Sequence, residues 1–357
     1  MVPVMRATVV ALVVAACAVA GGLDRGASAT SAPSLEQLVG QRLVVAMAGT
    51  TPSPALLARV RAGQVGGVIL FGANVRTSPQ VRALTNALQA AARAGGRPAL
   101  LIAVDQEGGG VRRIRWAPPT RSAAELGTLS TAKVEASGLA TARALRAVGV
   151  NVDLAPVADV PSVPGSFIAA QRRAFSTDPA RAAVLTTAFA RGLGAGGVAA
   201  TAKHFPGLGR ATASTDTQPV TISASRALLA SDIGPFRALV AGRVPLVMLS
   251  SATYSALDAK PGAWSPAVEA LLRKTLGFEG ATITDALEGV AATHDRTVAS
   301  AAVLAAQSGA DLLLVTSGEA TSDAVFGRLV AAASQGKIPR PALERSYDRI
   351  LALKRGL

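Results

Sequence analysis

The chain has 357 residues, of which 50% are hydrophobic and only 3% aromatic, and its formal net charge is +14 at pH 7. This length exceeds that of an average domain but suits a single α/β barrel, whose core must be built from Ala, Val, Leu and Ile. The positive charge indicates either attraction to a polyanion or an arginine-rich surface in solvent. Because no basic cluster interleaved with aromatic residues and no nucleic-acid-binding motif occurs, we favour the second interpretation and expect no nucleic-acid partner.

Residues 1–34 are expected to form a targeting signal followed by a flexible tether. Arg6 precedes the apolar run Ala7–Ala16, which is too short to span a membrane comfortably. Cys17 follows directly, after small residues, and this pattern resembles the lipobox of bacterial lipoproteins, in which the cysteine is lipidated. Ordinary cleavage after Ala29 is the alternative. Both interpretations predict export, either as a membrane-anchored lipoprotein or as a secreted or wall-associated protein. A single cysteine permits no internal disulfide and no multi-cysteine metal site.

Residues 35–357 alternate between short apolar runs and longer helical patterns. The predicted strands are Arg42–Met47, Gly67–Phe71, Leu100–Val104, Val150–Leu154, Ala199–Lys203, Pro245–Leu249, Ala281–Thr284 and Asp311–Val315. The predicted helices include Ser78–Ala94, Ser130–Ala147, Pro179–Leu193, Ser265–Leu276 and Thr297–Ser308. This alternation predicts a parallel sheet closed as a single-domain (β/α)8 TIM-type barrel, with an open doubly wound sheet as the alternative. No glycine-rich dinucleotide fingerprint follows the first strands.

Polar residues follow the ends of successive predicted strands. They are Asp105, Gln106, Glu107, Asp153, Asp159, Lys203, His204, Ser250, Ser251 and Asp285. In a barrel these side chains meet at the C-terminal face, where active sites are built. One charged strand end is readily explained as a helix cap, whereas a series on successive strands favours a functional site.

Individually, the candidate residues leave two interpretations open. Asp285 follows a buried apolar run, where a carboxylate needs a function or a partner; it is either the N-cap of the next helix or a nucleophile at the barrel mouth. Lys203 and His204 are either a satisfied polar pair or hydrogen-bond donors to a sugar or phosphate. The same ambiguity applies to Asp105, and a surface role is the default for Arg173 in so arginine-rich a chain.

In combination, the motifs resemble those of the single-domain bacterial β-N-acetylglucosaminidases (β-N-acetylhexosaminidases) of glycoside hydrolase family 3. The resemblance runs from about Leu35 to the C-terminus. The matching segments occur in family order: VDQEGGGVRR, NVDLAPVADV, RRAFSTDP, AKHFPGLG, LGFEGATITDAL and AGADLLLV. Any one segment is a weak signal, but six in order predict this fold and ancestry.

The resemblance implies a retaining glycosidase that needs neither a metal nor an organic cofactor. Asp285 matches the nucleophile that forms a covalent glycosyl-enzyme. The residues Asp105, Arg173, Lys203 and His204 match those that bind the acetamide-bearing sugar. The implied substrate is a carbohydrate, such as a peptidoglycan fragment with terminal β-linked N-acetylglucosamine, and we expect the protein to act as a monomer.

The chain departs from the family at the general acid/base. The family carries a histidine on a mobile loop, two residues after an aspartate; here the alignment places Asp216 on that aspartate and Gln218 on the histidine. Glutamine does not change protonation state near neutral pH. The only other histidine outside the Lys-His pair is His294, which we expect on the surface of a helix. Further departures are Ala286, Gly110 and Ser251, where acidic, Arg and His residues are usual.

Two functions are therefore expected from the sequence. The first is a retaining exo-β-N-acetylhexosaminidase with a degenerate acid/base loop and impaired activity, because loss of acid–base help typically costs about 10²–10⁴-fold. The alternative is an inactive pseudo-glycosidase that binds cell-wall sugars.

Overall fold

A computed structural model of the chain describes residues 1–3 and 32–357. The expected targeting signal, the tether and lipidation at Cys17 lie outside the described residues, apart from their terminal positions. Residues Ser34–Leu357 form one compact unit. No helix in the described part of the chain is both long and apolar enough to cross a membrane.

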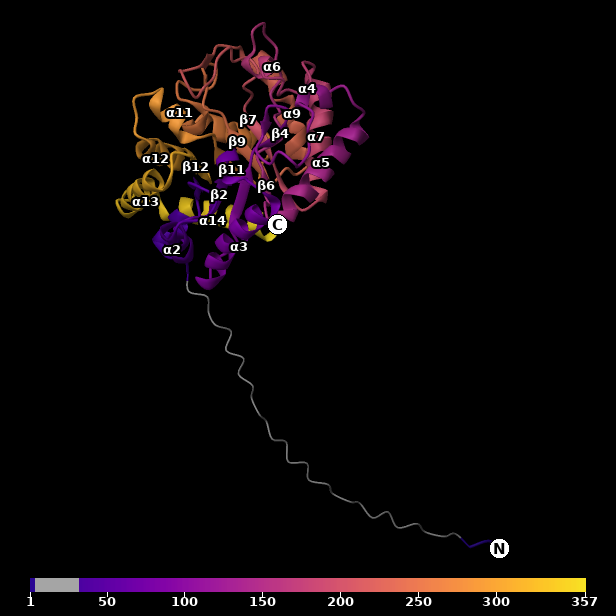
Figure 1. The fold of residues 1–357 in the computed structure, drawn as a ribbon, viewed down its shortest axis with the longest axis vertical. Helices are drawn as coiled ribbons and strands as arrows, with labels where there is room; N and C mark the ends of the chain where they lie inside the picture. Colours follow the sequence, from indigo (N-terminus) through magenta and orange to yellow (C-terminus); the bar gives the residue numbers. More distant parts are fainter. Residues whose placement is uncertain (4–31) are drawn as a thin grey trace. The chain divides into compact units, whose positions relative to one another are not determined.

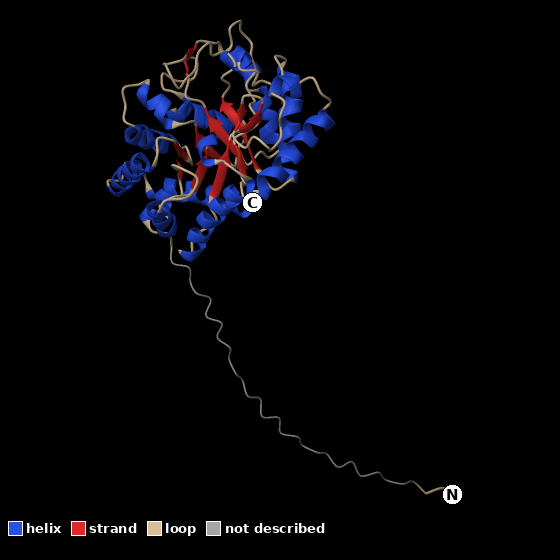
Figure 2. Ribbon diagram, in the orientation of Figure 1, coloured by secondary structure: helices blue, strands red, loops and turns tan. Residues whose placement is uncertain are grey.

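Eight parallel strands form the central sheet of this unit, and helices surround it (Figures 1 and 2). The strands are β1 (Leu43–Ala46), β2 (Gly67–Leu70), β3 (Leu101–Val104), β6 (Val152–Asp153), β7 (Ala199–Phe205), β9 (Leu246–Leu249), β11 (Ala281–Thr284) and β12 (Leu313–Val315). The order β11-β9-β7-β6-β3-β2-β1-β12 follows the chain, and a parallel bridge between Ile283 and Leu312 joins the two end strands. The predicted (β/α)8 barrel is confirmed, and the open sheet is excluded.

The barrel strands alternate their side chains between two cores. Val44 and Ala46 of β1 belong to an interior cluster, whereas Leu43 and Val45 pack outward against the helices. Both faces of each strand are therefore buried, which is why the strands read as continuous apolar runs instead of alternating ones.

Helices follow most strands and cover the outside of the barrel. They are α1 (Leu35–Gly40), α2 (Pro54–Ala62), α3 (Ser78–Ala94), α4 (Ala123–Leu126), α5 (Thr131–Ala147), α6 (Phe167–Ala170), α7 (Pro179–Ala195), α8 (Arg226–Asp232), α9 (Gly234–Ala241), α10 (Pro266–Ala270), α11 (Leu287–Ala292), α12 (Val298–Ser308), α13 (Glu319–Ser334) and α14 (Arg340–Arg355). Local sequence determines where such a helix begins. In α7, the Asp178 side chain caps the helix by accepting hydrogen bonds from the N–H groups of Ala180 and Arg181, and Pro179 is the first helical residue.

One predicted helix is wrong in its length. Ser265–Leu276 is not a single α-helix, because α10 ends at Ala270 and the chain widens into a π-helical turn over Leu271–Thr275. Short 3₁₀ turns occur at Gly72–Asn74 and Gly262–Trp264. Two small two-stranded sheets, which were not predicted, extend from the barrel: β4 (Gln106–Gly108) with β5 (Val111–Arg112), and β8 (Thr221–Ile222) with β10 (Thr253–Tyr254).

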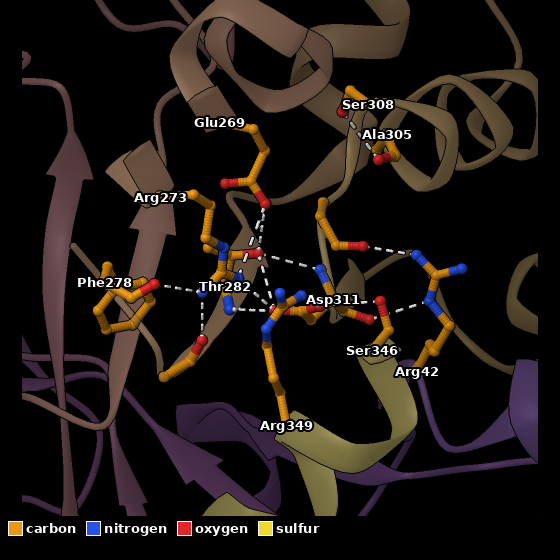
Figure 3. A network of polar contacts seen from close by, with 12 residues as sticks. Arg42, Glu269, Arg273, Phe278, Thr282, Ala305, Ser308, Asp311, Ser346 and Arg349 are labelled. Atoms are coloured by element: carbon orange, nitrogen blue, oxygen red, sulfur yellow. Dashed lines mark hydrogen bonds and ion pairs between the residues drawn. The ribbon is translucent and has the colours of Figure 1, made fainter. Parts of the chain in front are cut away.

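The end of the barrel where the strands begin is closed by α14. Ile350 and Leu353 of this helix join the interior cluster. Beside them, the buried Asp311 accepts hydrogen bonds from Arg273, Ser346 and Arg349 (Figure 3). This closure leaves the other end of the barrel, where the strands finish, for a site.

Candidate active site

A pocket of about 340 Å³ lies at the C-terminal ends of the barrel strands. It is lined by the six residues to which the resemblance assigns catalysis or sugar binding: Asp105, Arg173, Lys203, His204, Asp216 and Asp285. Asp105 follows β3, Lys203 and His204 belong to β7, and Asp285 follows β11. The volume lies near the lower end of the range of about 300–1,000 Å³ that is typical of small-molecule sites. The structure therefore brings the predicted residues together around a space for a small polar ligand.

A buried ion cluster forms one part of the pocket wall. The Lys203 ammonium lies 2.8 Å from Asp105 and 2.6 Å from Glu107. Arg173 donates two hydrogen bonds of 2.8 Å to the Glu107 carboxylate, from Nε and from Nη2. Arg173 therefore does not take the surface role that is the default for an arginine in this chain; its side chain is mostly buried in this cluster and lines the pocket, where the resemblance to family 3 places it.

The charges in this cluster hold each other ionised. Burial by itself would raise the pKa of Glu107, but the adjacent Lys203 and Arg173 lower it to about 2. Burial by itself would lower the pKa of Lys203, but Asp105 and Glu107 raise it above its ordinary value. The cluster thus presents fixed, charged donors and acceptors to the pocket, as recognition of a hydroxyl-rich ligand requires.

His204 is oriented by Asp159, a residue to which no role was assigned from the sequence. Its Nδ1 lies 2.7 Å from one carboxylate oxygen of Asp159. The other oxygen accepts from the backbone N–H groups of His204 and Leu208, at 3.1 and 2.7 Å. Gly209 packs against the backbone next to Asp159, since a Cβ atom on Gly209 would lie 1.9 Å from the carbonyl oxygen of Val160. The Lys-His-Phe-Pro-Gly segment is therefore held by side-chain and backbone contacts together.

Asp285 does not cap a helix. The N-cap of α11 is Ala286, which makes no side-chain capping bond. Instead, one oxygen of Asp285 accepts from the Ala286 N–H at 2.8 Å, and the side chain lines the pocket. Of the two interpretations left open by the sequence, the helix cap is therefore wrong, and the carboxylate faces the pocket.

The acid/base loop divides its residues between the pocket and solvent. Ser214, Thr215 and Asp216 line the pocket, and Asp216 is also exposed to solvent; Gln218 is exposed as well but is not among the described lining residues. His294 was expected on the surface of a helix, and this prediction is wrong. The residue follows the end of α11 and is half-buried, and its ring packs edge-on against Trp264 with centroids 5.7 Å apart. It is likewise absent from the described lining residues.

Glu107 was expected at the C-terminal face among the strand-end polar residues, and it lines the pocket, but no individual role was predicted for it. A signal for it was present: Asp105 and Glu107 are two residues apart in extended chain, so their side chains project from the same face. Its partner, Arg173, lies 66 residues further along the chain. Arg113, which also lines the pocket and lies 3.7 Å from Asp105, was not singled out either.

Comparisons with known proteins agree with this geometry. The model of the glycosyl hydrolase family 3 N terminal domain matches residues 34–353. An uncharacterized secreted glycosyl hydrolase from Arthroderma benhamiae is 36% identical over 327 residues, covering 88% of this chain and 92% of that protein.

Two solved structures are similar to this chain over most of its length. A family 3 β-N-acetylglucosaminidase from Paenibacillus sp. superposes with a TM-score of 0.88 at 33% identity, over 91% of this chain and 63% of that one. A β-N-acetylhexosaminidase from Beutenbergia cavernae superposes with a TM-score of 0.84 at 33% identity, over 91% of this chain and 99% of that one. Together with the barrel and the pocket at its C-terminal face, these matches establish that the chain belongs to glycosyl hydrolase family 3.

Proposed function

We propose that this protein is a retaining exo-β-N-acetylhexosaminidase that removes terminal β-linked N-acetylglucosamine from glycans such as peptidoglycan fragments. The observation that carries the proposal is the Asp285 carboxylate, which faces the same pocket as the Asp105, Lys203, Arg173 and His204 side chains. Two relatives of known structure are named for hydrolysis of this sugar class.

In this mechanism the polar wall of the pocket orients the sugar. Lys203 and Arg173 are donors, Asp105 is an acceptor, and His204 is held by Asp159. Asp285 attacks the anomeric carbon, the bond to the leaving-group oxygen breaks, and a glycosyl ester forms on the carboxylate. Water then attacks the same carbon and releases the sugar with its β configuration retained.

The test uses 4-nitrophenyl N-acetyl-β-glucosaminide, with Asp285→Ala as the variant. We expect turnover by the wild-type protein, loss of at least about 10³-fold on removal of the nucleophile, and the β-anomer as the first product by NMR. Asp348→Ala, an exposed aspartate on α14, is the matched control and should be unchanged. Absence of turnover by the wild type, or Asp285→Ala activity equal to wild type, contradicts the proposal. Binding of N-acetylglucosamine without any turnover would instead indicate a pseudo-glycosidase.

We further propose that the protein is exported and held at the membrane through a lipid on Cys17, where it acts as a monomer. The apolar run before Cys17 supports lipidation at this residue, and the relative named as secreted supports export. Metabolic labelling with a radioactive fatty acid should mark the wild-type protein in the membrane fraction but not Cys17→Ala. A Cys17→Ala protein that keeps both label and location contradicts lipidation at this residue.

A further inference from the structure

The turn Ser214–Gln218 determines which loop side chain reaches the pocket. The backbone N–H groups of Thr217 and Gln218 both donate to the carbonyl of Ser214 at 3.4 Å, so the chain reverses here. The Asp216 N–H donates to the Ser214 hydroxyl at 3.2 Å. The result is that Asp216 lines the pocket while Gln218 faces solvent.

Gly289 of α11 provides the surface on which this turn rests. A Cβ atom at Gly289 would lie 2.8 Å from the Asp216 Cα and 3.0 Å from its Oδ1, so only glycine permits the observed approach. Because α11 begins two residues after Asp285, the turn and the nucleophile are positioned by the same short stretch of chain. Asp216 and Asp285 therefore line one pocket, Asp216 packed against α11 and Asp285 just before the start of that helix.

The two carboxylates also have different surroundings. Asp285 accepts a hydrogen bond from the Ala286 N–H at 2.8 Å, and Asp216 accepts one from the Ser214 hydroxyl at 3.5 Å. Although water reaches Asp216, the protein around it and the nearby negative charge of Asp285 raise the pKa of its carboxyl. Asp216 thus combines a place in the pocket wall with a carboxyl that keeps its proton to a higher pH than an ordinary aspartate does, as a proton donor requires.

Neither histidine offers a simple replacement for Asp216. His204 already uses Nδ1 and its backbone N–H to contact Asp159, as part of the sugar-binding wall. The Nδ1 of His294 lies 3.0 Å from the carbonyl of Val290, and this residue is not among the described residues lining the pocket.

We propose that Asp216 itself is the general acid/base of this enzyme, and that it transfers the proton without a histidine. This inference rests on the proposed hydrolase function. In the first step, the Asp216 carboxylic acid gives its proton to the leaving-group oxygen as Asp285 bonds to the anomeric carbon. In the second, the Asp216 carboxylate takes a proton from the attacking water as the ester bond to Asp285 breaks. The carboxylic acid is thereby regenerated, and one water is consumed per glycosidic bond.

The test compares Asp216→Asn with the wild type on two leaving groups. A 2,4-dinitrophenolate leaves without protonation, so its kcat/KM should fall by less than about 5-fold, whereas kcat/KM for N,N′-diacetylchitobiose should fall by about 10²–10⁴-fold. Because water attack also loses its base, kcat on the dinitrophenyl substrate should fall, and added azide should restore it with formation of the β-glycosyl azide. The basic limb of the wild-type pH profile should be absent from the variant.

Three further proteins make the outcome decisive. Asp216→Glu should recover part of the chitobiose activity, and Gln218→Ala should match the wild type. Asp285→Ala should lose activity on both substrates. Equal losses on the two leaving groups in Asp216→Asn, or no loss on chitobiose, overturn the role of Asp216 while leaving the nucleophile intact. Failure of the wild type on both substrates instead overturns the hydrolase function itself.

Discussion

Glu107 joins Arg173 and Lys203 into one buried unit: it accepts two hydrogen bonds of 2.8 Å from Arg173, and its Oε1 lies 2.6 Å from the Lys203 ammonium. Its side chain is only 3% exposed. Two cations that line the pocket thus share one carboxylate, which lines the pocket beside them, and Lys203 also contacts Asp105.

Glu107→Gln should weaken substrate binding more than it slows the chemical step. The amide keeps the shape but removes the negative charge, which leaves Lys203 and Arg173 less well held and their mutual repulsion less compensated. We expect KM to rise by about 10-fold or more, with a smaller change in kcat. Steady-state kinetics on the aryl substrate measure both. A kcat loss at unchanged KM contradicts this positioning role.

The same substitution should alter stability in acid. The pKa of Glu107 in the folded protein is about 2, below its ordinary value of 4.5, because Lys203 and Arg173 outweigh its burial. A depressed carboxylate pKa contributes stability above pH ~4.5 that is lost as the pH falls toward ~2. Urea denaturation of the wild type should therefore show a drop in the free energy of unfolding across this range that is smaller in Glu107→Gln. Parallel curves for the two proteins contradict the assignment.

Asp153 should show the opposite pH dependence. It is fully buried, one oxygen accepts from the Gln106 N–H at 3.0 Å, and the other has no hydrogen-bond partner. Burial raises its pKa to about 8 from 3.8. The folded state therefore binds a proton that the unfolded state releases, so this contribution to stability is complete below pH ~4 and is lost as the pH rises through ~8.

Asp153→Asn removes that titration while keeping the acceptor for Gln106. The difference in unfolding free energy, variant minus wild type, should become more positive from pH 5 to pH 8 by at most about 1.4 kcal/mol per pH unit, and then level off. Denaturant titrations at several pH values measure it. A difference that is independent of pH shows that Asp153 is ionised when the protein is folded.

Much of the barrel could be predicted from the sequence because its signals are local. The helix Ser78–Ala94 was predicted with its observed bounds, since Thr77 caps it and its apolar residues form one stripe. The Ser265–Leu276 prediction failed in its second half, where Arg273 makes contacts outside the helix: it donates to the carbonyls of Phe278 and Gly280 in the following loop and to the carboxylate of Asp311, 38 residues away. A prediction from local helix propensity does not include hydrogen bonds to residues outside the helix.

The candidate site divides in the same way. Residues at the ends of parallel strands necessarily meet at one face, so the convergence of Asp105, Lys203 and Asp285 follows from the strand pattern alone. The direction of the Asp216 turn does not, because it depends on its packing against Gly289, 73 residues further along the chain. The sequence alignment located the altered position at Gln218, whereas the fold indicates which neighbouring group faces the pocket.

Gly289→Ala should displace the acid/base turn without removing any charged group. The new methyl would meet the Asp216 backbone at 2.8 Å, a distance that real Cβ atoms essentially never show, so the turn has to shift. We expect kcat/KM for the disaccharide to fall by about 10-fold or more, because small displacements of a proton donor are costly. The dinitrophenyl substrate should be much less affected.

Gly327→Ala is the matched control, because the space around that helical glycine is open. It should leave both activities unchanged, and its thermal midpoint should equal or exceed that of the wild type. If Gly289→Ala keeps wild-type activity on the disaccharide, the packing of the Ser214–Gln218 turn against Gly289 does not position Asp216 for catalysis.

At the closed end of the barrel, Asp311 should be among the most sensitive positions for stability. Its carboxylate is fully buried and accepts from Arg273 at 2.6 Å, Ser346 at 2.8 Å, Arg349 at 3.1 Å and the Thr282 N–H at 2.9 Å (Figure 3). Removing it takes the carboxylate partner from Arg349, leaves Arg273 with only its longer contact of 3.9 Å to Glu269, and releases α14 from the start of β12. We expect Asp311→Ala to lower the free energy of unfolding by about 3–5 kcal/mol.

The matched control for Asp311 is Asp323→Ala on α13. Asp323 also pairs with an arginine, Arg59 at 3.6 Å, but its side chain is 69% exposed. Since solvent screens such pairs, its removal should cost less than about 1 kcal/mol. Denaturant unfolding of both variants separates the two cases. Equal losses of unfolding free energy would contradict this prediction. They would mean that the buried network around Asp311 stabilises the protein no more than a surface ion pair does, because the cost of desolvating its charges cancels their attraction.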